Sequence, residues 1–247
     1  MITRTTKKGK GFTLLELMMV IAAIAAIAFV LLPALSRPRR TSCYINCVNN
    51  LKQVGLSFRL WDGDNGEKYP MQVVATSGGP AQQSSIADGS GAAYLYQVFQ
   101  VMSNELGTPK IVVCPEDKDR NIATNFGGHF DALGNAGISY FVGKDADEAQ
   151  PQLILAGDRN IGLKPTQGWG GNTSGSGPTG FSPLYGKAGN YLSLSNYAMD
   201  PRLQWTDRLH QGKGNVVLSD GSVQQLDSIK MRAAITSSSN ATWAYFP

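Results

Sequence analysis

His210 and the pair Asp220-Gly221, which follows it after nine residues, are the first candidates for chemistry in this sequence. A histidine and an aspartate can form an acid–base pair or supply two metal ligands. Zinc takes three or four protein ligands, however, and the other histidine, His129, stands in a glycine-rich stretch. No G-x-S-x-G or comparable nucleophile motif accompanies them. We therefore predict no catalytic residue and no metal site, and we expect Asp220 to shape a turn.

The runs on either side of Asp220-Gly221, residues 215–218 and 222–226, are typical of a β-hairpin. Asp-Gly between two alternating runs favours a type I′ turn, because both central residues of that turn have positive φ angles. We expect His210 to cap or hydrogen-bond the hairpin. Two alternatives stay open: catalysis by His210 and Asp220, and a calcium site built from Asp158, Asp220 or nearby carbonyl groups. No other cofactor is expected.

Three cysteines allow one intramolecular disulfide and leave one thiol over. Cys47 lies on the apolar face of a predicted helix, and Cys114 ends a short apolar run that we interpret as a strand packing on that face. We therefore predict a Cys47–Cys114 disulfide. Cys43 and Cys47 are four residues apart on one helix, a spacing that is awkward for a disulfide without helix distortion. Buried free thiols are the alternative.

The excess of positive charge is confined to the first residues of the chain. The net charge is +4, from 22 basic and 18 acidic residues. Arg4, Lys7, Lys8 and Lys10 account for the whole excess, because no acidic residue precedes Gly11. The remainder is neutral and lacks the basic footprint of a nucleic-acid-binding protein. The four cations instead fit a leader that stays on the cytoplasmic side of a membrane during insertion.

The most apolar part of the chain follows this basic leader. Residues 17–35 carry no charge, and a helix of that length spans about 30 Å, the hydrocarbon thickness of a bilayer. We therefore predict a transmembrane helix over residues 12–36. Glu16 stands near its beginning and is a functional candidate, because a carboxylate within a bilayer costs roughly 2.5–3.5 kcal/mol. Pro33 should kink the helix.

The order of these features resembles one protein family. A basic leader ending in Gly11, followed by Phe12-Thr-Leu-Leu-Glu16 and an apolar span, is similar to the processing site of type IV prepilins and type II secretion pseudopilins. The resemblance implies cleavage after Gly11 and N-methylation of Phe12. It also implies that Glu16 pairs with the α-amine of a neighbouring subunit, which sets the register of assembly, and that Pro33 marks a helix kink.

Further stretches of the chain look like one large group of these prepilin-type proteins. They are Cys47-Val-Asn-Asn-Leu-Lys-Gln-Val-Gly-Leu, Cys114-Pro-Glu-Asp, Gly157-Asp-Arg-Asn, and a C-terminal signature of His210, Asp220 and Gly221. The resemblance therefore covers both ends of the chain and several points between them.

The expected architecture is α+β and pilin-like. After the leader, residues 1–11, the transmembrane helix continues as an amphipathic helix over residues 37–61, and the two form one long helix. In the body, residues 62–247, that helix should pack on a small antiparallel sheet with long loops. Within the body we expect a helix over 92–106, strands over 111–114, 138–142 and 152–156, and a surface loop over 162–190.

The sequence favours a structural role rather than an enzymatic one. We expect a single-pass inner-membrane protein with a periplasmic C-terminal domain, processed by a prepilin peptidase and methyltransferase. It would assemble with other pilin-like subunits into a type IV pilus or a type II secretion pseudopilus. One alternative is a membrane-anchored, non-polymerising binding module for a surface polymer or secreted cargo, and a weaker one is an anchored hydrolase. Neither alternative requires Glu16, whereas assembly does.

Overall fold

The computed structural model of the 247-residue chain describes residues 13–35, 38–81, 94–164, 182–183, 190–194, 198–237 and 243–246. The chain divides into two compact units, Met1–Ser42 and Cys43–Pro247. Gly11 and Phe12, where the sequence predicts processing, lie outside the described residues. Most of the predicted surface loop over 162–190 lies outside them as well.

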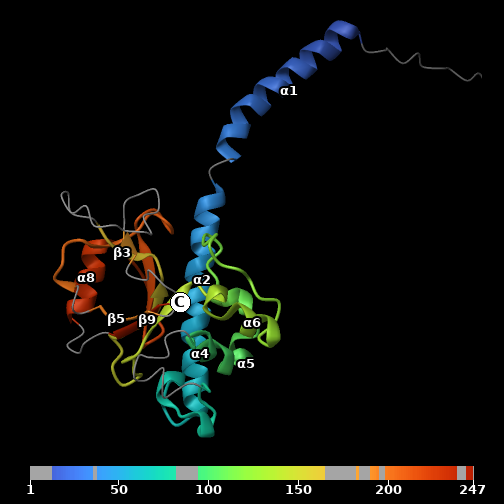
Figure 1. Ribbon diagram of the computed structural model, residues 1–247. Helices are drawn as coiled ribbons and strands as arrows, with labels where there is room; N and C mark the ends of the chain where they lie inside the picture. Colours follow the sequence, from blue (N-terminus) through green and yellow to red (C-terminus); the bar gives the residue numbers. More distant parts are fainter. Residues whose placement is uncertain are drawn as a thin grey trace, which may run out of the picture. The chain divides into compact units, whose positions relative to one another are not determined.

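The N-terminal region contains two helices, α1 (Leu14–Leu35) and α2 (Pro38–Asp64) (Figure 1). The prediction of one long pilin-like helix is therefore wrong. Pro38 supplies the physical reason: it has no amide hydrogen to donate, and it disfavours helical geometry in the residue before it. A new helix consequently starts at this proline. α2 ends at Asp64, inside the Asp-Gly-Asp-Asn-Gly stretch whose composition is typical of a turn.

Within the part of the chain that the structure describes, none of the helices combines the length and the apolarity that crossing a membrane requires. This finding contradicts the predicted transmembrane segment over 12–36 and the single-pass inner-membrane, periplasmic location that depended on it. A membrane span needs about 20 consecutive apolar residues. Glu16 places a carboxylate in the first turn of α1, and Pro33 removes a backbone hydrogen-bond donor from its last turn.

Short helices make up one side of the second unit. The helix predicted over 92–106 is present as two pieces, α4 (Tyr96–Val101) and α5 (Ser103–Leu106). The strand predicted over 111–114 is absent: Ile111 and Val112 belong to a 3-10 helix, η4 (Pro109–Val112), and residues 113 and 114 follow it outside any strand. Pro109 occupies its first turn and the Thr108 hydroxyl accepts the amide hydrogen of Lys110, so both residues favour a helical start over a strand. The described residues also contain the helical elements η1 (Pro70–Gln72), η2 (Ala75–Ser77), α6 (Gly128–Leu133), η5 (Gly134–Gly137) and α8 (Ser228–Ser237).

Among the described residues, two antiparallel sheets replace the single small sheet that the sequence predicts. Their strands are β1 (Tyr140–Gly143), β2 (Ile154–Asp158), β3 (Ile161–Leu163), β4 (Ser182–Pro183), β5 (Asn190–Ser193), β6 (Leu203–Trp205), β7 (Gly214–Leu218), β8 (Val223–Leu226) and β9 (Trp243–Phe246). A six-stranded sheet has the order β5-β9-β1-β2-β7-β8, and a three-stranded sheet has the order β4-β3-β6. The predicted strands over 138–142 and 152–156 correspond to β1 and β2, the central strands of the six-stranded sheet.

The central strands β1, β2 and β7 of the six-stranded sheet are buried on both faces. One face, which includes Tyr140 and Val217, shares a core with the apolar side of α2, and this side contributes Leu51, Val54 and Phe58. The other face packs against the second sheet and α8 through residues such as Phe141, Val216, Trp205 and Met231. Successive residues of a strand point to opposite faces, so Tyr140 and Phe141 enter different cores. α2 thus lies between the sheet and the short helices α4 to α6 (Figure 1).

The predicted C-terminal hairpin is present as β7 and β8, but its turn differs from the predicted type. Gly221 has a φ angle of 81°, whereas Asp220 is not among the residues with positive φ, so a type I′ turn is excluded. The amide of Gly221 donates to the carbonyl of Leu218, and the amide of Leu218 donates to that of Ser222. These bonds describe a three-residue loop with glycine at its left-handed position.

α2 receives this hairpin at Gly55 and Arg59. A side-chain carbon at Gly55 would lie 2.6 Å from the Cγ2 atom of Val217, so only glycine allows β7 to approach the helix so closely. One turn further along α2, the Arg59 guanidinium donates a hydrogen bond of 3.3 Å to the carbonyl of Asp220. The β7–β8 turn is therefore fastened to the C-terminal half of α2.

Candidate functional site

The buried polar centre of the second unit brings together stretches that lie far apart in the sequence. We call it the His210 cluster and define it as Cys114, Glu116, Asp158 and His210 together with Cys47. The cysteine of α2, the Cys114-Pro-Glu-Asp stretch, the end of β2 and the loop before β7 each supply one or two of these residues. These are the stretches that carry the resemblance described above. Their convergence makes this cluster the candidate functional site.

His210 is held by an unusual backbone conformation. It has a φ angle of 52°, and Gln211 and Gly212 after it also have positive φ angles. Histidine reaches this left-handed region more readily than most residues, but the conformation is uncommon and needs support from its surroundings. Asn160 gives that support, because its side-chain amide lies 3.0–3.1 Å from the carbonyls of Thr206, Leu209 and Lys213 around the same loop.

The imidazole of His210 lies between two carboxylates. Its Nδ1 atom is 2.7 Å from Oε2 of Glu116, and its Nε2 atom is 3.4 Å from Oδ2 of Asp158. The side chain is only 1% exposed, and Tyr44 of α2 covers it with an edge-on ring contact, the ring centroids being 5.5 Å apart. The two ring nitrogens thus face different environments: Nδ1 points to a half-buried carboxylate and Nε2 points into the interior.

Asp158, the last residue of β2, is fully buried. Its Oδ2 atom accepts hydrogen bonds from the backbone amide and the side-chain amide of Asn215, at 2.7 and 2.9 Å. Burial raises the pKa of Asp158 to about 6, although the charge of His210 and the bonds from Asn215 act in the opposite direction. Its Oδ1 atom is buried without a hydrogen-bond partner.

A buried ion pair fixes the Cys114-Pro-Glu-Asp stretch to the end of β2. The Arg159 guanidinium makes two parallel bonds of 2.7 Å to the carboxylate of Asp117, and both side chains are less than 5% exposed. Asp119 adds a longer contact to the same guanidinium and a second one to Arg208. This two-bond geometry orients Glu116, the neighbour of Asp117, towards His210.

A disulfide closes the cluster on the side of α2. The structure joins Cys47 to Cys114, the pair that the sequence analysis named, with their Cα atoms 5.2 Å apart. The Sγ atom of Cys114 also lies 3.5 Å from Nε2 of His210. Cys43, the third cysteine, is half-buried and free.

The remaining predicted site residues lie outside this cluster. Asp220 accepts the amide hydrogen of Ser222 and shapes the hairpin turn, so the acidic neighbours of His210 are Glu116 and Asp158 instead. Pro33 lies in the last turn of α1. Glu16 lies in the first turn of α1, where it takes part in a capping box. Its carboxylate accepts from the Thr13 amide at 3.4 Å, and its own amide donates to the Thr13 hydroxyl at 3.3 Å.

A second pair of acidic groups lies at the end of α2. Asp62 is buried, and neither oxygen of its carboxyl has a hydrogen-bond partner. Burial, together with the nearby carboxylates of Glu148, Glu67 and Asp147, raises the pKa of Asp62 to about 7. Glu148 lies beside Asp62 and is bound by Arg59 at 3.0 Å, and these neighbours lower the pKa of Glu148.

Replacing Asp62 with asparagine should remove a pH-dependent loss of stability. The folded carboxyl keeps its proton up to about pH 7, whereas the unfolded one releases it near pH 4, so stability falls as the pH rises between these values. At pH 8 we expect Asp62→Asn to be more stable than the wild type by about 4 kcal/mol, and at pH 4 to be equal to it. Urea unfolding of both proteins from pH 4 to pH 8 measures this difference, and a constant difference would contradict the assignment.

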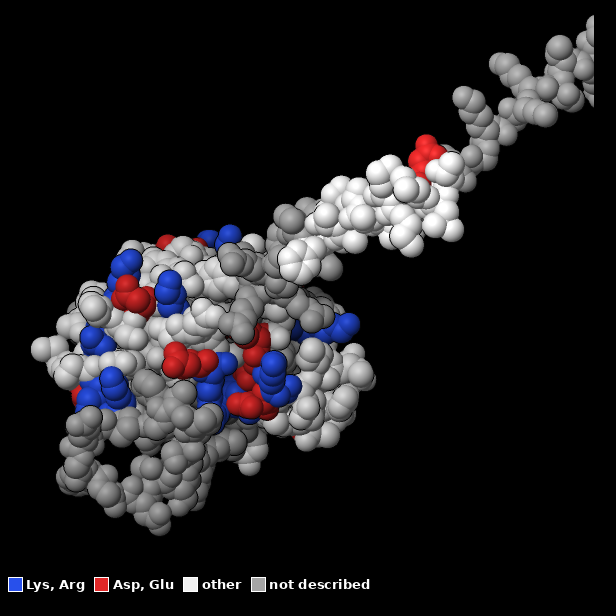
Figure 2. All heavy atoms as spheres, turned by 90° about the horizontal axis from the view of Figure 1, so that it is seen from above, with Lys and Arg blue, Asp and Glu red and all other residues white. Residues whose placement is uncertain are grey.

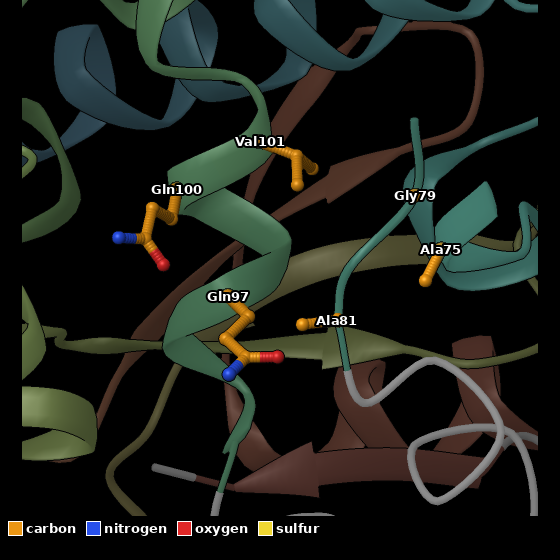
Figure 3. Close-up of a pocket in the computed structure, with 6 residues that line it drawn as sticks. All are labelled: Ala75, Gly79, Ala81, Gln97, Gln100 and Val101. Atoms are coloured by element: carbon orange, nitrogen blue, oxygen red, sulfur yellow. The ribbon is translucent and has the colours of Figure 1, made fainter. Parts of the chain in front are cut away.

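The surface hollow drawn in Figure 3 offers no comparable chemistry. It is lined by Ala75, Gly79, Ala81, Gln97, Gln100 and Val101, and none of these side chains titrates or acts as a nucleophile. The amide of Gln100 is engaged in bonds to Phe126 and Asp131. The His210 cluster, by contrast, carries the chemistry but is closed to a substrate by its burial. The arrangement of the His210 cluster suits a structural or ligand-binding role better than the catalysis of a reaction.

Comparison with known proteins adds no identification. The chain matches no protein-family model, and neither a curated protein nor a solved structure is similar enough to match it.

Proposed function

We propose that the chain is a structural, pilin-like subunit that assembles with other such subunits through α1. The observation that carries the proposal is the apolar surface of that helix. Its exposed side chains include Leu14, Met18, Ile24, Ile27 and Phe29, and the exposed fraction of Phe29 reaches 82%. A contiguous apolar surface of this extent marks an interaction site in a stable protein. Helix packing between subunits would remove it from water.

The charge of α1 suits ordered assembly better than nonspecific clustering. Glu16 is the single charged residue of the helix, and Figure 2 shows one acidic residue near the beginning of an otherwise uncharged surface. Cleavage after Gly11 would create a cationic α-amine at Phe12, within reach of Glu16 of a neighbouring subunit. A single ion pair on an apolar helix specifies register, because any shifted packing leaves a charge without a partner.

The capping box gives Glu16 a second role, which the experiment has to separate from the first. Glutamine at the third helical position keeps a capping box but carries no charge, whereas alanine loses both. If the charge sets the register, Glu16→Gln and Glu16→Ala should each lower the yield of filaments by at least about 10-fold, as the loss of about 1.4 kcal/mol or more would. Filaments are measured by sedimentation and negative-stain electron microscopy of the full chain, co-produced with a prepilin peptidase.

Glu67→Gln, a change at an exposed carboxylate of the body, is the matched control and should leave assembly unchanged. Normal filaments from Glu16→Gln, with loss in Glu16→Ala, would show that Glu16 only caps the helix. A wild-type chain that forms no filaments would contradict the proposed function itself. The mass of the N-terminal peptide tests processing separately: a methylated Phe12 is expected, and an intact Met1 would reject it.

A further inference from the structure

We propose that Cys47, Cys114 and His210 form a zinc site when the Cys47–Cys114 disulfide is reduced. One donor atom from each of Cys47, Cys114 and His210 lies within 4.8 Å of the others, and all three residues are buried. The inference concerns the second unit alone and does not depend on assembly through α1. The sequence by itself suggested too few ligands, because only the folded chain brings the two cysteines beside the histidine.

The distances match those of a tetrahedral zinc site. Zinc–sulfur bonds of about 2.3 Å and zinc–nitrogen or zinc–oxygen bonds of about 2.0–2.1 Å place neighbouring donor atoms about 3.3–3.8 Å apart. The Sγ atom of Cys114 lies 3.5 Å from Nε2 of His210, and Oδ2 of Asp158 lies 3.4 Å from the same nitrogen. The edge between Cys114 and His210 therefore already has the required length, and the carboxylate of Asp158 lies next to it.

Asp158 borders the three-residue group on the side of His210 and is not itself a member of it. Its carboxylate is fully buried, and its Oδ1 atom has no hydrogen-bond partner, which is an unfavourable state for a polar group in the protein interior. Asn215 fixes the other oxygen with two hydrogen bonds and thereby orients the carboxylate. A cation at the centre of the cluster would satisfy the buried negative charge.

Glu116 holds the backbone that presents His210 to the site. The amide of His210 donates to Oε2 of Glu116 at 3.3 Å, and Nδ1 of the ring lies 2.7 Å from the same oxygen without forming a hydrogen bond to it. The other ring nitrogen, Nε2, faces Cys114 and Asp158. A carboxylate next to a ligating histidine is a common feature of metal sites. Glu116 is therefore a positioning residue rather than a ligand.

The disulfide and the metal are alternative states of the same two sulfur atoms. A dithiol reductant transfers two electrons and two protons to the Cys47–Cys114 bond, so the S–S bond breaks, two thiols form and the reductant becomes a disulfide. Zinc then binds the two thiolates and releases the two protons. In the oxidised state the sulfur atoms carry no negative charge, so no site exists. The cluster is thus a redox-controlled metal site.

The test uses the full chain with Cys43 changed to serine, so that every thiol counted belongs to the site. The protein is reduced in denaturant, refolded without oxygen in the presence of Zn²⁺ or Co²⁺, and freed of excess metal. We expect one metal ion per reduced chain and none per oxidised chain. Co²⁺ should show sulfur-to-cobalt charge transfer and the visible absorption of a tetrahedral site. Equal metal binding by the oxidised chain would overturn the proposal.

Two variants separate ligation from folding. His210→Asn keeps a residue that tolerates positive φ and should weaken Co²⁺ binding by about 100-fold or more, and Glu116→Gln should weaken it by about 10–100-fold. His129→Asn, at the exposed histidine, is the matched control and should change nothing. Unaltered Co²⁺ affinity and spectrum in both site variants would overturn the proposal. A reduced chain that neither folds nor binds in the presence of either metal would overturn it as well.

Discussion

Replacing both Cys47 and Cys114 with alanine should lower the free energy of unfolding by about 4 kcal/mol. The disulfide closes a loop with a sequence separation of 67, and the loss of this cross-link gives the unfolded chain a larger conformational entropy. Both cysteines are fully buried, so the change also removes packed sulfur atoms from the core beneath α2. Urea unfolding in the presence of a chelator and without reductant measures the difference.

Cys43→Ala is the control for this experiment, because the same residue type is removed from α2 at a half-buried position without breaking a bond. It should leave the midpoint of unfolding nearly unchanged. Reducing the wild-type protein should reproduce the loss seen in the double variant. A double variant no less stable than Cys43→Ala would mean that the cross-link contributes nothing to the fold.

The sequence predicts the elements that depend on local patterns. Apolar residues three and four apart indicate the buried side of α2, where Cys47, Leu51, Val54 and Phe58 are fully buried. Asp220-Gly221 indicates a hairpin, but the same dipeptide occurs in two-residue and three-residue loops, so it does not determine the turn type. The prediction of a strand over 111–114 was wrong for a different reason. The β-branched residues there favour a strand, but Thr108 and Pro109, which precede them, start a 3-10 helix.

The candidate site could be predicted only in part, because its residues meet through tertiary structure. His210 and Cys114 are 96 positions apart, and His210 finds Asp158 rather than the nearby Asp220. The role of Asn160 in holding the loop has no local signature. Thr13-Leu-Leu-Glu16, by contrast, is a recognisable capping box, and this signal was available in the sequence.

The β-sheets are more extensive than the small sheet that the resemblance at the N-terminus implies. Strand β9, at the C-terminal end, pairs with both β5 and β1, and the second sheet covers the outer face of the first. A strand that is buried on both faces is a continuous apolar run in the sequence, and such a run does not reveal which distant segment it pairs with. The predicted sheet was therefore smaller than the observed one.

Asp117→Asn, which removes the two short bonds from Arg159 to a buried carboxylate, should destabilise the protein by about 3–5 kcal/mol. Arg159→Met should cost a similar amount, since it leaves Asp117 unpaired. The double variant should be more stable than the sum of the two losses predicts, because neither charge then remains buried alone. Equilibrium urea unfolding of the four proteins gives this coupling free energy.

An exposed ion pair of the same residue types provides the comparison. Arg202 and Asp200 are joined at 2.6 Å, but the arginine is 45% exposed, so Arg202→Met should barely move the midpoint of unfolding. The buried pair also orients Glu116 towards His210. We therefore expect Asp117→Asn to weaken Co²⁺ binding by the reduced chain, whereas Arg202→Met should not. If the double variant loses the sum of the free energies of unfolding lost by Asp117→Asn and Arg159→Met, the two side chains act independently. The ion pair would then not be the contact that fixes Cys114 and Glu116 beside β2.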